Sequence, residues 1–326
     1  MNKQKKFLLY AVLILGALML VVMAALAPSD PVHRHKKTSS NAERTSKVVK
    51  EPHRHRQKTA DYTMSSGASS SAKPAQSSSA LIPKSAPASQ KPAGPNLYKM
   101  DGTEYPSEAR SDAAIAPIRN RVGHLIWNGY GAYVVNSDQP SLGSVKSYGR
   151  PWAQNHTDSQ GRPTVADAYL TKQARQYRSR QSTGNGATSW KPAGYQQQFN
   201  LPGQYRFAYN RGHLLGYALV GNIRGFNASE ANYDNIATQT MWANQAWGAQ
   251  NTGQNYYEGI VRRALDQNKF VRYQVRDWYF GNDEVPRATQ IQAESSDGSV
   301  RFNVLVPNTQ NNILINYSNG AVTRCN

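Results

Sequence analysis

The sequence has almost no cysteine: Cys325 is the only one among 326 residues. An intramolecular disulfide is therefore excluded, and so is a zinc or iron–sulfur site built on several cysteines. A lone thiol beside the last residue fits an incidental side chain better than a nucleophile. Any metal that this chain binds must accept oxygen or nitrogen ligands.

Acidic residues are also scarce. The chain has 20 Asp and Glu against 38 Lys and Arg, a formal net charge of +18. Such an excess favours an anionic partner, either nucleic acid, anionic lipid or wall polymer, or it only keeps a basic tail in solution. Residues 28–96 carry 12 Lys and Arg against 4 Asp and Glu, and the remaining chain is still basic.

Only one long hydrophobic run occurs. Residues 7–27 contain no charged side chain, and three lysines precede them. A secretory signal has a hydrophobic region of about 7–15 residues, whereas a membrane span needs about 20. We therefore interpret residues 1–27 as a signal anchor, with one transmembrane helix and the bulk of the chain outside the cell. Ala25-Leu26-Ala27 is an acceptable cleavage site, so secretion after cleavage behind Ala27 stays open.

The next segment, residues 28–96, is rich in Ser, Ala, Pro, Lys and His and has few large hydrophobic side chains. It cannot bury enough surface to offset the entropy of ordering, so we predict a disordered basic linker. Its two His- and Arg-containing pieces, residues 33–36 and 53–56, fit solvated charge better than metal sites. Aromatic and aliphatic residues return at Leu97, and residues 97–326 are predicted to form one folded domain.

The fold class predicted for this domain is α+β, with a mainly antiparallel central sheet and flanking helices. Residues 256–269 carry hydrophobic side chains at helical spacing. Residues 270–280 and 299–306 alternate with period two, which predicts strands. Asn319-Gly320 predicts a hairpin between residues 313–317 and 321–324. Residues 125–135 are expected to form one strand with glycine irregularities, and residues 178–195 a loop.

The segment Asn210-Arg211-Gly212-His213 carries the strongest sign of chemistry. A neutral imidazole can serve as a general base, and only His124, His156 and His213 lie in the predicted domain. Arg211 can offer its forked donors to a phosphate, and Gly212 would let the backbone approach that phosphate closely. An isolated histidine is usually a structural residue, and His124 and His156 are interpreted in that way.

A stretch rich in amides follows and contains Asn235, Gln239 and Asn244; it ends at Glu258, on the first turn of the predicted helix. Amides are weak neutral ligands, but one would suit a Mg²⁺ ion that keeps most of its waters and takes other oxygens from the substrate. The alternative is helix capping and ordinary polar surface. These residues alone do not decide between the two.

Longer strings extend the pattern: RGHLLGYAL, IATQT, WANQA, TGQNYYE, VRRALDQNK and FNVLVPN. Together they resemble the DNA/RNA non-specific endonuclease family, whose active site is a ββα-metal (His-Me finger) unit. Within that family the strings are most similar to the membrane-anchored nucleases through which DNA enters competent Gram-positive bacteria, and to secreted streptodornase-like relatives. The predicted signal anchor fits the first group.

The resemblance implies a role for each matching residue. His213 matches the general base, Arg211 the arginine that contacts the phosphate, and Asn244 the asparagine that binds Mg²⁺ from the helix of the finger. The residues that orient either the base or the water shell of the metal match Asn235, Gln239 and Glu258.

One position departs from the family pattern. The motif usually begins with Asp, whereas this chain has Asn210, whose amide accepts hydrogen bonds but supplies no negative charge. The departure puts the positioning of His213 and the rate in question. The basic loop with Arg178 and Arg180, followed by Lys191, is predicted to contact DNA.

The implied activity is hydrolysis of DNA by a sequence-non-specific endonuclease that depends on Mg²⁺ or Mn²⁺ and leaves 5′-phosphate and 3′-hydroxyl ends. RNA stays open as a second substrate. Two alternatives also stay open: a catalytically weak protein that captures DNA at the membrane, and a surface protein that grips anionic wall polymer. The retained His213, Asn244 and Glu258 favour the nuclease, because a pure binder needs cations rather than this polar set.

Overall fold

The computed structural model describes residues 97, 100, 102–143, 149–186 and 188–326. The predicted signal anchor, the cleavage site after Ala27 and the whole of the predicted linker lie outside these residues. The proposed division at residues 27 and 96 therefore stays a prediction. In the part of the chain that is described, no helix combines the length and the hydrophobicity needed to cross a membrane.

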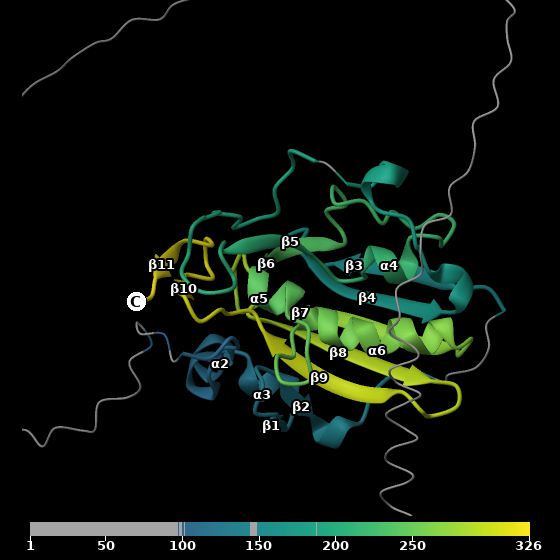
Figure 1. Ribbon diagram of the computed structural model, residues 1–326, viewed down its shortest axis with the longest axis horizontal. Coiled ribbons are helices and arrows are strands. Elements are labelled where there is room, and N and C mark those ends of the chain that lie inside the picture. The colour runs from purple at the N-terminus through teal and green to yellow at the C-terminus, as the bar shows by residue number, and fades with distance from the viewer. Residues whose placement is uncertain (1–96, 98–99, 101, 144–148, 187) are drawn as a thin grey trace, which may run out of the picture. The chain divides into compact units, whose positions relative to one another are not determined.

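A seven-stranded sheet forms the centre of the fold (Figure 1), with the strand order β1-β2-β9-β8-β7-β4-β3. Every pairing among the described strands is antiparallel, as predicted. Its strands are β1 (Leu125–Trp127), β2 (Tyr133–Val135), β3 (Trp152–Thr157), β4 (Pro163–Leu170), β7 (Val271–Trp278), β8 (Ala288–Ser295) and β9 (Arg301–Pro307).

Two smaller sheets and five described α-helices complete the fold. The small sheets are two-stranded and pair β5 (Tyr209–His213) with β6 (Ile236–Thr240), and β10 (Ile313–Ile315) with β11 (Val322–Arg324). The helices are α2 (Glu108–Ile115), α3 (Arg119–Val122), α4 (Tyr217–Val220), α5 (Met241–Gln245) and α6 (Gln254–Asp266). Short 3₁₀ helices span Asn136–Asp138, Lys172–Ala174 and Gln181–Thr183.

Helix α6 packs across β7 and β8 and closes the main hydrophobic core (Figure 1). Tyr257, Val261 and Leu265 face inward from the helix, as its predicted hydrophobic stripe requires, and meet alternate side chains of the strands, such as Tyr273 and Val304. Each such side chain contributes on the order of 2 kcal/mol when it is buried. The helix is therefore held rigidly on the sheet, and its other face is free to carry polar residues.

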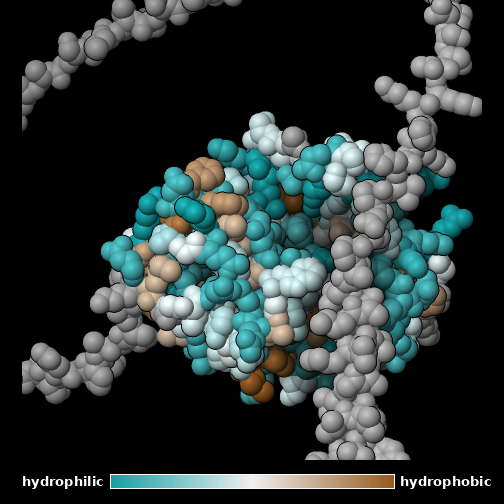
Figure 2. Space-filling model, viewed as in Figure 1, coloured by the Kyte–Doolittle hydropathy of each residue, from teal (hydrophilic) through white to brown (hydrophobic). Residues whose placement is uncertain are grey.

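The surface contrasts with this core. Figure 2 shows a face that is mostly hydrophilic, with hydrophobic residues gathered in small separate patches. Trp242, Tyr133 and Tyr169 are the largest of the fully buried side chains, whereas a few aromatic side chains such as Trp247 and Phe199 are exposed.

Two predicted elements differ from the structure. Residues 125–135 form two strands rather than one, because Gly129 and Gly131 adopt φ angles of 84° and 104° and turn the chain. Helix α6 begins and ends before the predicted bounds of 256 and 269: it starts behind Gly253 and stops where Asn268 adopts a φ of 62°. Glu258 consequently lies on the second turn, not on the first.

The other predicted elements are confirmed within a few residues. Strands β7 and β9 occupy the two segments of period two, and β10 pairs with β11 around Asn319-Gly320. The predicted loop 178–195 contains only a short 3₁₀ turn among its described residues.

Candidate active site

The base candidate and the metal-ligand candidate come from one ββα unit. His213 ends β5, which pairs with β6 so that Asn210 lies opposite Gln239. Helix α5 follows β6 directly, and Thr240 begins it by accepting a hydrogen bond from the backbone N–H of Ala243. This short connection brings Asn244 back over β5, where its Oδ1 accepts a hydrogen bond of 3.1 Å from Nδ2 of Asn210.

His213 and Asn244 line the same space. Two neighbouring cavities of about 310 and 270 Å³ share four lining residues: Arg180, His213, Asn244 and Gln245. We call these two cavities together the site cleft. The larger also reaches Asn210 and Arg211, and the smaller reaches Glu258 and Arg262. The predicted base and the predicted metal ligand can therefore act on one bound group.

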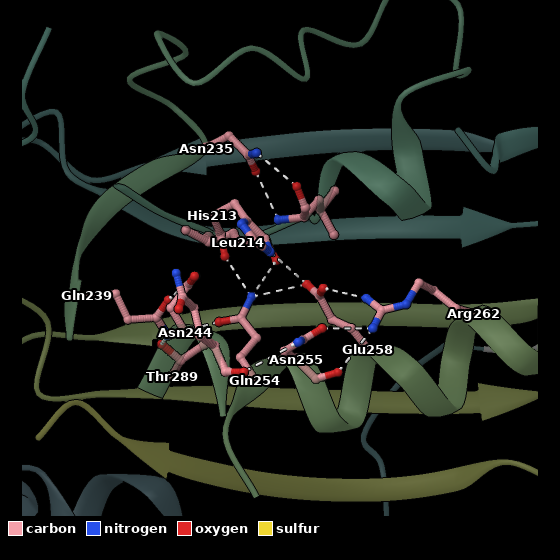
Figure 3. Close-up of polar contacts among 12 residues, drawn as sticks. His213, Leu214, Asn235, Gln239, Asn244, Gln254, Asn255, Glu258, Arg262 and Thr289 are labelled. Atoms are coloured by element: carbon pink, nitrogen blue, oxygen red, sulfur yellow. Dashed lines mark hydrogen bonds and ion pairs between the residues drawn. The ribbon is translucent and has the colours of Figure 1, made fainter. Parts of the chain in front are cut away.

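A buried carboxylate holds the imidazole. Oε1 of Glu258 lies 2.9 Å from Nε2 of His213, and Oε2 lies 3.2 Å from Nη1 of Arg262 (Figure 3). Burial alone would raise the pKa of Glu258, but the neighbouring His213 and Arg262 outweigh it and hold that pKa below its ordinary value. Glu258 is thus a carboxylate at neutral pH.

The hydrogen bond between Glu258 and His213 fixes the tautomer of the base. A carboxylate can only accept hydrogen bonds, so Nε2 of His213 must carry the proton that Glu258 receives. A neutral imidazole then has its lone pair on Nδ1, the atom that can take a proton from water. Within the described residues, no side chain or backbone group hydrogen-bonds to this atom.

The amide of Asn244 is oriented in a similar way. Its Nδ2 donates to Oε1 of Gln239 at 2.9 Å, so the oxygen is left on the side of Asn210 and the cleft. Among the described residues no three His, Cys, Asp or Glu side chains gather as metal ligands. One neutral oxygen suits a hard cation that keeps most of its waters and takes oxygens from a phosphate, so the residues present fit Mg²⁺ or Mn²⁺.

Sequence reasoning missed two residues of α6 that lie beside Glu258. Gln254 is fully buried, and its Nε2 donates to the carbonyl oxygen of His213 at 2.7 Å and to Oε1 of Glu258 at 3.3 Å (Figure 3). Arg262 pairs with Glu258 and lines the cleft. The signal was present: Gln254, Glu258 and Arg262 follow one another at i, i+4 and i+8, on one face of the helix.

The packing of Gln239 requires a glycine at position 212. A Cβ at this position would lie 2.4 Å from Cβ and 2.5 Å from Oε1 of Gln239. The missing side chain therefore makes room for Gln239, and the close approach of this backbone to a phosphate stays a prediction. Gly216 does the same for Glu258, whose carboxylate oxygens would lie 2.7 and 2.8 Å from a Cβ there.

Asn235 and Gln239 are both buried and lie behind the cleft. Asn235 accepts from the backbone N–H of Leu215 and donates to the carbonyl oxygen of the same residue, both at 3.0 Å. It thereby holds the chain just after His213. Gln239 contacts Asn244 and Gln254 instead.

The predicted phosphate and DNA contacts separate into two groups. Arg211 lines the cleft, while its Nε and Nη2 donate to the carbonyl oxygens of Trp190 and Thr188 at 2.8 and 3.1 Å. Arg180 lines both cavities of the cleft. By contrast, Arg178 is exposed and donates to the carbonyl oxygen of Ser182, and Lys191 lines a separate cavity of about 240 Å³. The structure does not bring these last two to the cleft.

Comparisons with known proteins show which family this chain belongs to. The sequence model of the DNA/RNA non-specific endonuclease family matches residues 150–323, which contain every residue of the site. The crystal structure of NucA from Streptococcus agalactiae with magnesium ion bound is 39% identical, with a TM-score of 0.61, over 64% of this chain and 95% of that one. The structure of NucA with no metal bound gives 37% identity and a TM-score of 0.59, over 67% and 97%.

Proposed function

Since the chain belongs to the DNA/RNA non-specific endonuclease family and is a metal-dependent nuclease, we propose that it cleaves DNA with Mg²⁺ and leaves 5′-phosphate and 3′-hydroxyl ends. The observation that carries the proposal is that His213 and Asn244 line one cleft. RNA, which has the same phosphodiester link, is proposed as a second substrate.

Each residue of the cleft then has a distinct task. Arg211 and Arg180 bind the phosphate oxygens through charge-assisted hydrogen bonds. His213 accepts a proton from a water molecule at Nδ1 as that water attacks phosphorus. The positive charge that forms on the ring faces Glu258, 2.9 Å away, which stabilises it. Asn244 would hold the metal ion, which would offset charge on the phosphate and on the departing 3′ oxygen; that oxygen takes a proton from solvent water to become the 3′-hydroxyl.

Sequence-independent cleavage follows from contacts that go to the phosphate rather than to base edges. The excess of Lys and Arg over Asp and Glu supports a polyanionic substrate. Because binding to a polyanion releases counterions, the affinity for DNA should fall steeply as salt increases.

We further propose that the enzyme acts outside the cell, anchored in the membrane by residues 7–27 or secreted after cleavage behind Ala27. The support is the uncharged run of residues 7–27 with lysines before it. Fractionation of cells that express the full chain, with an antibody against its C-terminal part, separates the two forms by location and mass.

Digestion of a supercoiled plasmid tests the activity. With Mg²⁺ we expect nicking and then fragmentation, and no cleavage with EDTA. The fragments should be labelled by polynucleotide kinase only after phosphatase treatment, because their 5′ ends carry phosphate. Cleavage that persists in EDTA, or ends with 3′-phosphate, would contradict the proposal. DNA binding without cleavage in Mg²⁺ or Mn²⁺ would favour the DNA-capture alternative that Asn210 raised.

A further inference from the structure

A buried chain of amides and hydroxyls lies behind Asn244. Gln239 is its centre: it is only 3% exposed and it contacts Asn244, Gln254 and Thr289. Figure 3 shows these side chains converging on one another from β6, α5, α6 and β8. An amide has one end that donates and one that accepts, so the direction of each hydrogen bond here constrains the next.

Gln254, beside His213, is the first residue that fixes the orientation of the Gln239 amide. Nε2 of Gln254 faces three oxygens: the carbonyls of His213 and Leu214, at 2.7 and 3.5 Å, and Oε1 of Glu258 at 3.3 Å. All three can only accept, so a reversed Gln254 amide would place its own oxygen against three acceptors. Its Oε1 must therefore face Gln239 and accept from Nε2 of that residue, at 2.9 Å.

Residues of the central sheet favour the same orientation of the Gln239 amide from the other side. Thr289 on β8 lies opposite Asp277 on β7, and its hydroxyl donates to Oδ1 of Asp277 at 2.7 Å. That hydroxyl has a single proton. When Asp277 is ionised and takes this proton, the hydroxyl can only accept from Nε2 of Gln239, at 3.5 Å.

We propose that Gln254, together with Thr289 and Asp277, are positioning residues that fix the amide of Gln239 and thereby turn the oxygen of Asn244 into the cleft. With Nε2 of Gln239 held by both supports, its Oε1 points to Nδ2 of Asn244 at 2.9 Å. The Oδ1 of Asn244 is then the outward atom. A reversed Asn244 would present an NH₂ group, which cannot bind a cation.

This inference rests on the proposed function, because it assumes that Oδ1 of Asn244 binds the ion. The two supports act on one amide, so each partly compensates for the loss of the other. Removing both should therefore cost more than the product of the two separate losses, which is the signature of coupled residues.

The test measures binding of Mn²⁺ alone to the full-length protein, from the loss of the free Mn²⁺ signal in electron paramagnetic resonance. Gln254→Met should weaken binding by about tenfold, and Thr289→Val by about threefold because its bond is the longer one. The double variant should lose more than about thirtyfold, the product of those two losses. Thr289→Ser, which keeps the hydroxyl, should bind as the wild type does.

Thr238→Val is the matched control. Thr238 is a fully buried neighbour of Gln239 on β6, but its hydroxyl donates to the carbonyl oxygen of Ala193, away from the chain of amides. It should lower the unfolding temperature in EDTA as Thr289→Val does, yet leave Mn²⁺ affinity unchanged. A loss of affinity that only followed the loss of stability across these variants would overturn the inference.

Asn244→Ala separates the two proposals. If this variant binds Mn²⁺ like the wild type, the metal site of the proposed function is wrong. If it loses binding while Gln254→Met stays within twofold of the wild type, only the positioning role is overturned. Should the double variant fail to fold, the Gln254→Met result decides by itself.

Discussion

The two halves of the cleft position their functional side chains through different interactions. In the base half, His213 is placed by a charged partner, since Glu258 lies between the imidazole and Arg262. In the metal half, Asn244 is placed by neutral amides, with Asn210 on one side and Gln239 on the other. The contrast teaches that a charge can fix a tautomer, whereas a neutral ligand has to be aimed by the direction of its hydrogen bonds. Substitutions in the base half should therefore mainly lower catalysis, and substitutions in the metal half should mainly change metal affinity.

The largest expected effect tests the base half by deleting the base. His213→Ala should lower the cleavage rate by about 10²–10⁴-fold, because a positioned base contributes that much to proton transfer. DNA binding, measured with EDTA present, should be retained, since the arginines of the cleft remain. His156→Ala is the control, because His156 is exposed on β3. Wild-type cleavage by the His213 variant would refute the assignment of the base.

A smaller effect is expected when the base keeps its partner but loses the charge. Glu258→Gln retains the shape and an accepting oxygen, yet its amide can also present NH₂ and favour the wrong tautomer. We expect a loss of about 10–100-fold in kcat with little change in Mn²⁺ affinity. Glu108→Gln, on the exposed start of α2, should be silent. If Glu258→Gln weakened metal binding as strongly as catalysis, the two halves would not be separate.

The metal half can be tested by adding a negative charge beside Asn244. Asn210→Asp removes the N–H that Oδ1 of Asn244 accepts and places a carboxylate beside the cleft. Because ligand charge strengthens the binding of hard cations, Mg²⁺ affinity should rise by about threefold to tenfold. Asn282→Asp adds the same charge at an exposed site and should leave the affinity unchanged. A weaker Mg²⁺ affinity in Asn210→Asp would show that the neutral half needs its amide.

The smallest effect concerns the pH dependence of stability. Two buried carboxyl groups, Glu258 and Asp277, have pKa values shifted in opposite directions. The lowered pKa of Glu258 stabilises the fold above its ordinary value of 4.5, and this contribution is lost as the pH falls through the lowered folded value. Burial raises the pKa of Asp277 to about 7, so its contribution is present below 3.8 and is lost as the pH rises to about 7.

Urea unfolding at several pH values separates these two contributions. Asp277→Asn should flatten the decline in the free energy of unfolding between pH 4 and 7. Glu258→Gln should flatten the decline on the acid side. A decline between pH 4 and 7 that is identical in wild type and Asp277→Asn would contradict the raised pKa.

Periodicity in the sequence was enough to predict α6 and part of the central sheet. The hydrophobic stripe of Tyr257, Val261 and Leu265 identifies α6, and the alternation around Tyr273 identifies β7, because burial on one face selects those spacings. Five strands were not predicted from the sequence: β3, β4, β5, β6 and β8. In β8, the buried side chains of Thr289, Gln290 and Gln292 are polar and bond to polar side chains, so its sequence lacks the apolar alternation of a strand.

The site was predictable as a set of residues but not as an arrangement. The motif around His213 and the amides downstream could be found, whereas the loop contacts of Arg178 and Lys191 could not be told from those of Arg180. The tasks of Asn235 and Gly212 depend on what lies across the β5–β6 hairpin, which local sequence does not record.

The central claim, that both halves serve one phosphodiester bond, is tested most directly by anomalous diffraction from Mn²⁺ in crystals of His213→Ala bound to a short DNA duplex. We predict a single anomalous peak within coordination distance of Oδ1 of Asn244, with a DNA phosphate between that peak and position 213. A peak away from Asn244, or a phosphate beyond the reach of residue 213, would contradict the account.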